Sequence, residues 1–109
     1  MATGRLYTPT QLGTGNTTLY IVPNATYSVC NVSLTNTGTV PVTIRLAIST
    51  AAAPTSPGPE WIEWDTTIVA KGVFERTGLV LGPNLYLVAL SSVGAVVNAT
   101  VYGIETSTT

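Results

Sequence analysis

The segment Val42-Thr43-Ile44-Arg45-Leu46-Ala47-Ile48-Ser49 carries the clearest pattern in this chain. In an extended strand, successive side chains point to opposite sides. Val42, Ile44, Leu46 and Ile48 would therefore share one side, and Thr43, Arg45, Ala47 and Ser49 the other. One apolar side and one largely polar side are typical of an antiparallel strand with a single buried face. The segment predicts a β-strand and offers no helical period.

Similar segments lie on both sides of this strand, separated by turn residues such as Asn36-Thr37-Gly38 and Gly82-Pro83-Asn84. A glycine at position 78 marks a candidate bulge. Short strands with turn signals at intervals of about 8–12 residues are typical of sandwiches and barrels. We therefore predict an all-β fold, an antiparallel β-sandwich or jelly-roll-like barrel of seven to eight short strands. The predicted strands are 17–22, 27–36, 42–49, 60–68, 73–81, 85–91 and 96–105.

The domain organisation follows from the same pattern. Residues 16–105 are expected to form one β-sandwich domain, because 109 residues is an ordinary length for a single domain. Residues 1–15 are expected to form an N-terminal arm, in which Leu6 and Tyr7 could add a short strand, and residues 106–109 a loose polar tail. Residues 50–59 contain three prolines and are expected to form a long loop.

Composition excludes several functions. Four basic and five acidic residues give a net charge of −1, and the chain has no His and one Cys. Without a basic surplus we expect no nucleic-acid partner. No apolar stretch approaches the roughly 20 residues that span a bilayer, and no signal peptide is evident, so we expect no membrane partner. A Ser-His-Asp or Cys-His catalytic site is impossible without His.

The densest polar cluster is Glu60-Trp61-Ile62-Glu63-Trp64-Asp65. Simple alternation would place Trp61, Glu63 and Asp65 on one side of a strand, and Glu60, Ile62 and Trp64 on the other. Carboxylates beside aromatic rings could serve a glycosidase or a sugar-binding cleft. The alternative, which we favour, is a strand with one core Trp and exposed acids at its edge, where charges deter aggregation between strands.

The remaining candidate residues indicate packing and interfaces more than chemistry. Cys30 is expected to be a buried small hydrophobe. Arg45 and Arg76 are expected on strand faces opposite the apolar sets, where Glu63, Glu75 or Asp65 could pair with them. We expect no catalytic residue, no cofactor and no metal. The interface candidates are Leu6, Tyr7, Trp61, Trp64, Arg45 and Arg76, because aromatic and Arg side chains dominate interface hot spots.

Six short sequence motifs occur in a fixed order along the chain. They are Pro9-Thr10-Gln11-Leu12, the segment from Leu19 to Thr26, Val29-Cys30-Asn31-Val32, Asn36-Thr37-Gly38, Gly78-Leu79-Val80-Leu81 and Val101-Tyr102-Gly103-Ile104-Glu105. Their order resembles small virion structural proteins of tailed bacteriophages, including phages of cyanobacteria. The resemblance covers nearly the whole chain, rests on structural motifs, and departs from the common pattern at Pro23-Asn24-Ala25-Thr26.

The resemblance implies a non-enzymatic virion protein. We expect it to decorate or cement a phage capsid on its exterior by non-covalent binding to shell subunits, as a homo-oligomer with a trimer favoured. The alternative is a tail, baseplate or fibre component that contacts a glycan on the host surface. Only 8% of the residues are charged, which fits a subunit whose surface is covered by neighbours.

Overall fold

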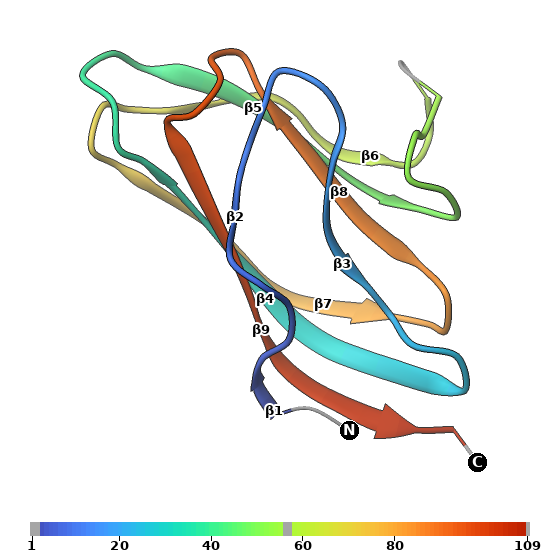
Figure 1. The fold of residues 1–109 in the computed structure, drawn as a ribbon. Helices are drawn as coiled ribbons and strands as arrows, with labels where there is room; N and C mark the ends of the chain where they lie inside the picture. The colour runs from blue at the N-terminus through green and yellow to red at the C-terminus, as the bar shows by residue number, and fades with distance from the viewer. Residues whose placement is uncertain (1–2, 56–57, 109) are drawn as a thin grey trace.

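The alternating segment at residues 42–49 forms strand β5 (Val42–Ser49), an inner strand of its sheet. The structure is a computed structural model that describes residues 3–55 and 58–108, and these contain nine strands and no helix (Figure 1). The other strands are β1 (Thr3–Arg5), β2 (Thr10–Gln11), β3 (Thr17–Ile21), β4 (Thr26–Asn36), β6 (Trp61–Ile68), β7 (Val73–Leu81), β8 (Tyr86–Ser91) and β9 (Val97–Ser107). The seven strands predicted from residue 17 onward are all present.

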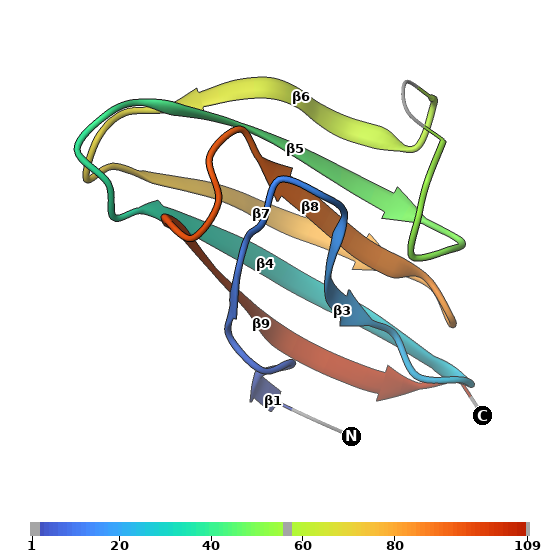
Figure 2. The same cartoon turned by 45° about the horizontal axis from the view of Figure 1, so that its top comes forward.

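The strands form two antiparallel sheets that pack face to face, so the fold is a β-sandwich (Figure 2). One sheet, called here the β4 sheet, has the order β1-β9-β4-β7, and β2 also pairs with β9. The other, the β5 sheet, has the order β3-β8-β5-β6. The prediction of an antiparallel all-β fold is therefore confirmed, and the sheets are separate layers.

The core lies between the two sheets and follows the predicted alternation. On β4 every second residue from Thr26 to Asn36 is buried, and on β5 Val42, Ile44 and Leu46 are buried. The end of β5 departs from the prediction, because Ala47 and Ser49 are buried as well and Ile48 is half-buried. Opposing apolar faces give the sandwich its stability, since each Å² removed from water contributes about 25 cal/mol. The largest fully buried side chains include Tyr20, Leu12, Leu19, Leu34, Ile44, Leu46, Leu81 and Leu87.

The N-terminal segment is part of the β4 sheet and not a free arm. Thr3 pairs with Ile104 and Thr10 with Ala99 on β9. Leu12 is 1% exposed, and its backbone N–H donates to the Val97 carbonyl at 2.8 Å. The segment adds to β9 because an uncovered strand edge leaves backbone groups unpaired. The short strand expected at Leu6 and Tyr7 lies earlier, at β1, although the Leu6 N–H still donates to the Val101 carbonyl.

The C-terminal end of β9 also extends further than predicted. Thr106 and Ser107 pair with Tyr27 and Thr26 of β4, and the Thr108 N–H donates to the Ala25 carbonyl at 3.0 Å. The loose tail expected from residue 106 is thus ordered through Thr108, because β4 begins early enough to supply partners. No helix long and apolar enough to cross a membrane occurs in residues 3–55 or 58–108.

Candidate functional site

Two irregularities in β6 determine which of its side chains face outward. Ile44 pairs with Thr66, Leu46 with Glu63 and Ala47 with Trp61, so two residues of β6, Trp64 and Asp65, lie opposite Arg45. This is a β-bulge, and Asp65 within it adopts a left-handed backbone conformation, with φ of 54°. Asp tolerates this conformation better than most residues.

Because of the bulges, the side chains of β6 are arranged differently from simple alternation. Trp64 and Asp65 lie together on the outer side of the β5 sheet, where both contact Arg45. Glu63 lies toward the other sheet, where its carboxylate accepts a hydrogen bond from Arg76 of β7. The prediction that Glu63 shares a face with Asp65 and that Trp64 opposes Asp65 is therefore wrong. One inserted residue reverses every later side chain of a strand.

Trp61, Trp64, Arg45 and Asp65 form one contiguous cluster, called here the tryptophan cluster. The two indole rings meet edge to face, with centroids 5.5 Å apart and an interplanar angle of 77°. The Arg45 guanidinium lies 3.7 Å from the centroid of the Trp64 ring. Such a contact is a cation–π interaction. Three of the six predicted interface candidates, Trp61, Trp64 and Arg45, are thus brought together.

Arg45 and Asp65 form a two-pronged ion pair. Arg45 Nε lies 2.7 Å from Asp65 Oδ1, and Nη2 lies 3.3 Å from Oδ2. The hydrogen bonds from Arg45 lower the pKa of the Asp65 carboxyl below its ordinary value. Asp65 was among the partners expected for Arg45, and this pairing is confirmed. The pair holds the guanidinium over the Trp64 ring.

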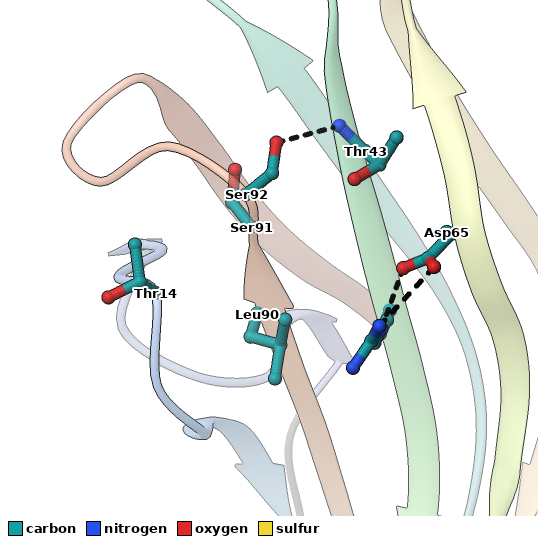
Figure 3. A pocket seen from close by; sticks show the side chains of 7 residues that line it. Thr14, Thr43, Asp65, Leu90, Ser91 and Ser92 are labelled. Carbon is teal, nitrogen blue, oxygen red and sulfur yellow. Dashed lines mark hydrogen bonds and ion pairs between the residues drawn. The ribbon is translucent and has the colours of Figure 1, made fainter. Parts of the chain in front are cut away.

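A shallow cavity of about 380 Å³ opens beside this ion pair (Figure 3). Its wall is rich in hydroxyl groups and combines residues from four parts of the chain. They are Thr14, Thr43, Arg45, Asp65, Leu90, Ser91 and Ser92. The Thr43 N–H donates to Ser92 Oγ at 3.0 Å, which ties β5 to the turn after β8. The sequence had not indicated Thr14, Thr43 or Ser92 as site residues, since they meet only in the folded chain.

Arg76 lies on the inner face of β7, because it pairs in register with the fully buried Val32 of β4. The prediction that it lies opposite the apolar set is wrong. The cause is a bulge at Thr77 and Gly78, whose φ is 70°, between the Cys30–Leu79 and Val32–Arg76 pairs. The bulge predicted at Gly78 is confirmed. From the inner face Arg76 reaches Glu63 and joins the two sheets along one edge.

Leu6 and Tyr7 lie far in sequence from the tryptophan cluster and pack in another part of the fold. Leu6 packs against the core, and the Tyr7 ring meets Tyr20 edge to face at 6.3 Å. The Tyr20 hydroxyl donates to the Glu105 carboxylate. Burial, reinforced by this hydrogen bond, raises the pKa of Tyr20 above its ordinary value. The hydrogen bond between Tyr20 and Glu105 thus closes the space between the sheets with a polar contact.

Cys30 is buried at 1% exposure on the inner face of β4, as predicted. Burial raises the pKa of its thiol, which disfavours the reactive thiolate. Within residues 3–55 and 58–108, no group of three or more Cys, Asp or Glu residues is placed to hold a metal ion.

No protein-family model, curated protein or solved structure matches this chain. Any functional conclusion therefore depends on the chemistry of its own residues.

Proposed function

We propose that this chain is a non-catalytic structural subunit of a larger particle, a protein that decorates or cements a phage capsid by binding shell subunits. The supporting observation is the chemistry of its surface. Four of its nine charged residues cancel in two internal ion pairs, Arg45–Asp65 and Arg76–Glu63. At the same time Val80, Val73 and Ile104 are 68%, 60% and 48% exposed. A weakly charged surface with exposed large apolar side chains suits a subunit that neighbours cover.

The proposed mechanism is burial and not reaction. Apolar surface removed from water stabilises each contact, and repetition over a symmetric shell multiplies modest affinities. The capsid exterior is the proposed location. The 50–59 loop is a candidate contact, although residues 56 and 57 lie outside the described residues. Its first half is held near β6, because Trp61 Nε1 donates to the Thr55 carbonyl at 2.9 Å.

The placement of the carboxylates also supports a non-enzymatic role. Glu63 is engaged by Arg76 on the inner side of β6, and Asp65 by Arg45 on the outer side. General acid–base hydrolysis of a glycoside needs two carboxyl groups that flank one bond. These two lie on opposite sides of their own strand. Turnover of a labelled glycan by the purified protein would overturn this part of the proposal.

The proposal is tested by the copy number of the protein in purified virions. Quantitative mass spectrometry against the major shell protein measures it. A ratio near that of the shell subunits is expected for a decoration or cement protein. A few copies per particle would move the protein to the tail, baseplate or fibre, and complete absence would overturn the structural role.

A second candidate function is contact with a glycan on a host surface, and the tryptophan cluster favours it. Trp64 is 43% exposed and offers a ring for stacking, while the adjoining cavity supplies hydroxyl groups. Arg45 and Asp65 could hydrogen-bond sugar hydroxyls from the same wall. Small-ligand sites commonly combine an apolar surface with a few polar groups in this way.

The variant Trp64→Ala separates the two functions. Lost adsorption to host cells with heat-stable capsids favours glycan contact. Heat-fragile capsids with normal adsorption favour cement. Val40→Ala serves as the control, because Val40 is a 56% exposed apolar residue in the turn after β4, outside the cluster.

A further inference from the structure

The outer face of the β4 sheet carries a row of exposed apolar side chains. Val29 of β4 pairs in register with Val80 of β7 on one side and with Ile104 of β9 on the other. Val80, Ile104 and Val29 are 68%, 48% and 38% exposed. Tyr27, the next outward residue on β4, is 39% exposed. We call these four residues the outer row.

This row is unusual for the solvent side of an antiparallel sheet. Such a sheet normally has polar residues on the face that does not meet the core. Single exposed apolar residues need no explanation, but a contiguous group indicates an interaction surface. The outer row spans three neighbouring strands and lies near one end of each, close to the start of β4 and to the ends of β7 and β9.

Two charged residues lie on the same outer face beyond the row, one at each edge of the sheet. Arg5 of β1 pairs in register with Tyr102 of β9, and Glu75 of β7 pairs with Ser33 of β4. Both are exposed. Within residues 3–55 and 58–108 neither forms an ion pair, since the two pairs present are Arg45–Asp65 and Arg76–Glu63. Glu75 does accept a hydrogen bond from the Tyr102 hydroxyl at 2.8 Å, which holds its carboxylate over the outer face.

We propose that a second copy of this chain packs face to face on the outer row, related by a two-fold axis that runs parallel to the strands. Such an axis places β1 of one copy over β7 of the other, because the strand order is β1-β9-β4-β7. Arg5 of each copy then lies over the partner's β7, two residues along the strand (about 7 Å) from Glu75, a distance that the long Arg side chain can span. Val29 faces the partner's Ile104. A two-fold interface makes each such contact twice.

The dimensions allow this pairing. Stacked sheets lie about 10 Å apart, a gap that outward Arg and Glu side chains from two copies can bridge. Each partner in a standard interface buries about 800 Å². The two larger dimensions of the molecule are 46 and 28 Å, so a broad face has room for that area. The inference deepens the proposed structural role, on which it rests for its biological context, and replaces the trimer favoured by the sequence with a two-fold pair.

The test is analytical ultracentrifugation of the full chain at physiological salt. The wild-type protein is expected to sediment as a species of twice 11.3 kDa. Val80→Lys and Ile104→Lys are each expected to raise the dimer Kd at least about tenfold, since a buried unpaired charge opposes association. Val69→Lys is the matched control, because Val69 is 64% exposed but lies in the turn between β6 and β7. Circular dichroism checks that each variant is folded.

A charge exchange tests the orientation of the two copies. Arg5→Glu and Glu75→Arg are each expected to weaken the dimer about five- to tenfold by opposing like charges, and the double variant to restore it. A monomeric wild type, a trimer, or a dimer insensitive to both lysine variants overturns the pairing. Failure of the double variant to restore association overturns the two-fold arrangement. Since these measurements use pure protein, they stand apart from the virion copy number: a dimer absent from virions would retain the pairing and remove the proposed function.

Discussion

Asp65 owes its place to a backbone conformation as much as to its side chain. Its left-handed φ of 54° turns two successive residues of β6 toward Arg45.

Asn36 connects more of the fold than the turn in which it lies. Its buried side-chain amide donates to the Val40 carbonyl at 2.9 Å and to the Ile68 carbonyl at 3.1 Å, and its Oδ1 accepts from the Gly38 N–H at 2.9 Å. One side chain thus joins the β4–β5 turn to the end of β6.

Replacing Arg45 with Met is expected to raise the pKa of Asp65 toward its ordinary value of about 3.9. The folded-state pKa of Asp65 lies below the unfolded value. The stabilisation by the pair is therefore fully present above the ordinary pKa and is lost as the pH falls through the lowered one. Carboxyl NMR titration measures the change. Arg76→Met is the control and should leave the Asp65 titration unchanged.

Replacing Asn36 with Ala is expected to destabilise the fold by about 2–4 kcal/mol, because buried carbonyl groups lose their donors. Chemical denaturation measures the free energy of unfolding. Thr39→Ala in the same exposed turn should change it by less than about 0.5 kcal/mol. Equal effects of the two variants would show that the Asn36 side chain does not join the turns.

At the scale of elements, β9 organises one whole sheet. It pairs with β1, β2 and β4, and its Gly103 lies opposite Cys30 of β4. A Cβ added at Gly103 would lie 2.1 Å from the Val29 carbonyl oxygen, and the residue has φ of 156°. A side chain there would push the two central strands apart.

Gly103→Ala is accordingly expected to destabilise the protein by about 2–4 kcal/mol, at the upper end of single substitutions. Gly94→Ala is the matched control, because an added Cβ there meets nothing within 4 Å. Thermal unfolding of both variants gives the comparison. A Gly103→Ala protein as stable as Gly94→Ala would contradict the close approach of β9 and β4.

The N-terminal segment makes a prediction at the same scale. Leu12 is buried and hydrogen-bonded along β9, so Leu12→Ala is expected to cost about 2–4 kcal/mol. Val40→Ala, an exposed apolar truncation in a turn, should cost less than about 0.5 kcal/mol. Urea denaturation compares them. A free arm, as the sequence had indicated, would make Leu12→Ala as mild as the control.

At the scale of the whole molecule, contacts near its edges hold the two sheets together beyond the apolar core. Arg76 of β7 meets Glu63 of β6 along one edge, and Glu63 also accepts from the Thr66 hydroxyl at 2.8 Å. Toward the opposite edge, Tyr20 of β3 meets Glu105 of β9. These contacts cross between sheets, whereas the Arg45–Asp65 pair lies within one.

A double-mutant cycle on Arg76→Met and Glu63→Gln is expected to give a coupling energy of about 0.5–1 kcal/mol that falls as salt is added. The Arg76 and Glu63 side chains are 40% and 19% exposed, so solvent screens the pair in part. Denaturation at two salt concentrations measures both quantities. A coupling energy of zero at low salt would mean that only the apolar core holds the two sheets together along that edge.

The sequence by itself determined the class of the fold and the position of seven strands, because period-2 alternation and Gly, Pro and Asn turns are local properties of the chain. It also indicated that Cys30 is buried and that Gly78 marks a bulge. Only the tertiary structure decided the side of β6 on which Glu63 and Asp65 lie, the inner position of Arg76, and the pairing of residues 3–12 with β9. A bulge changes the register of a strand only relative to a partner strand. Likewise, the N-terminal segment can pair with a sheet edge only once that sheet has formed. The tryptophan cluster and the outer row likewise arise from register between strands distant in sequence, which no local pattern encodes.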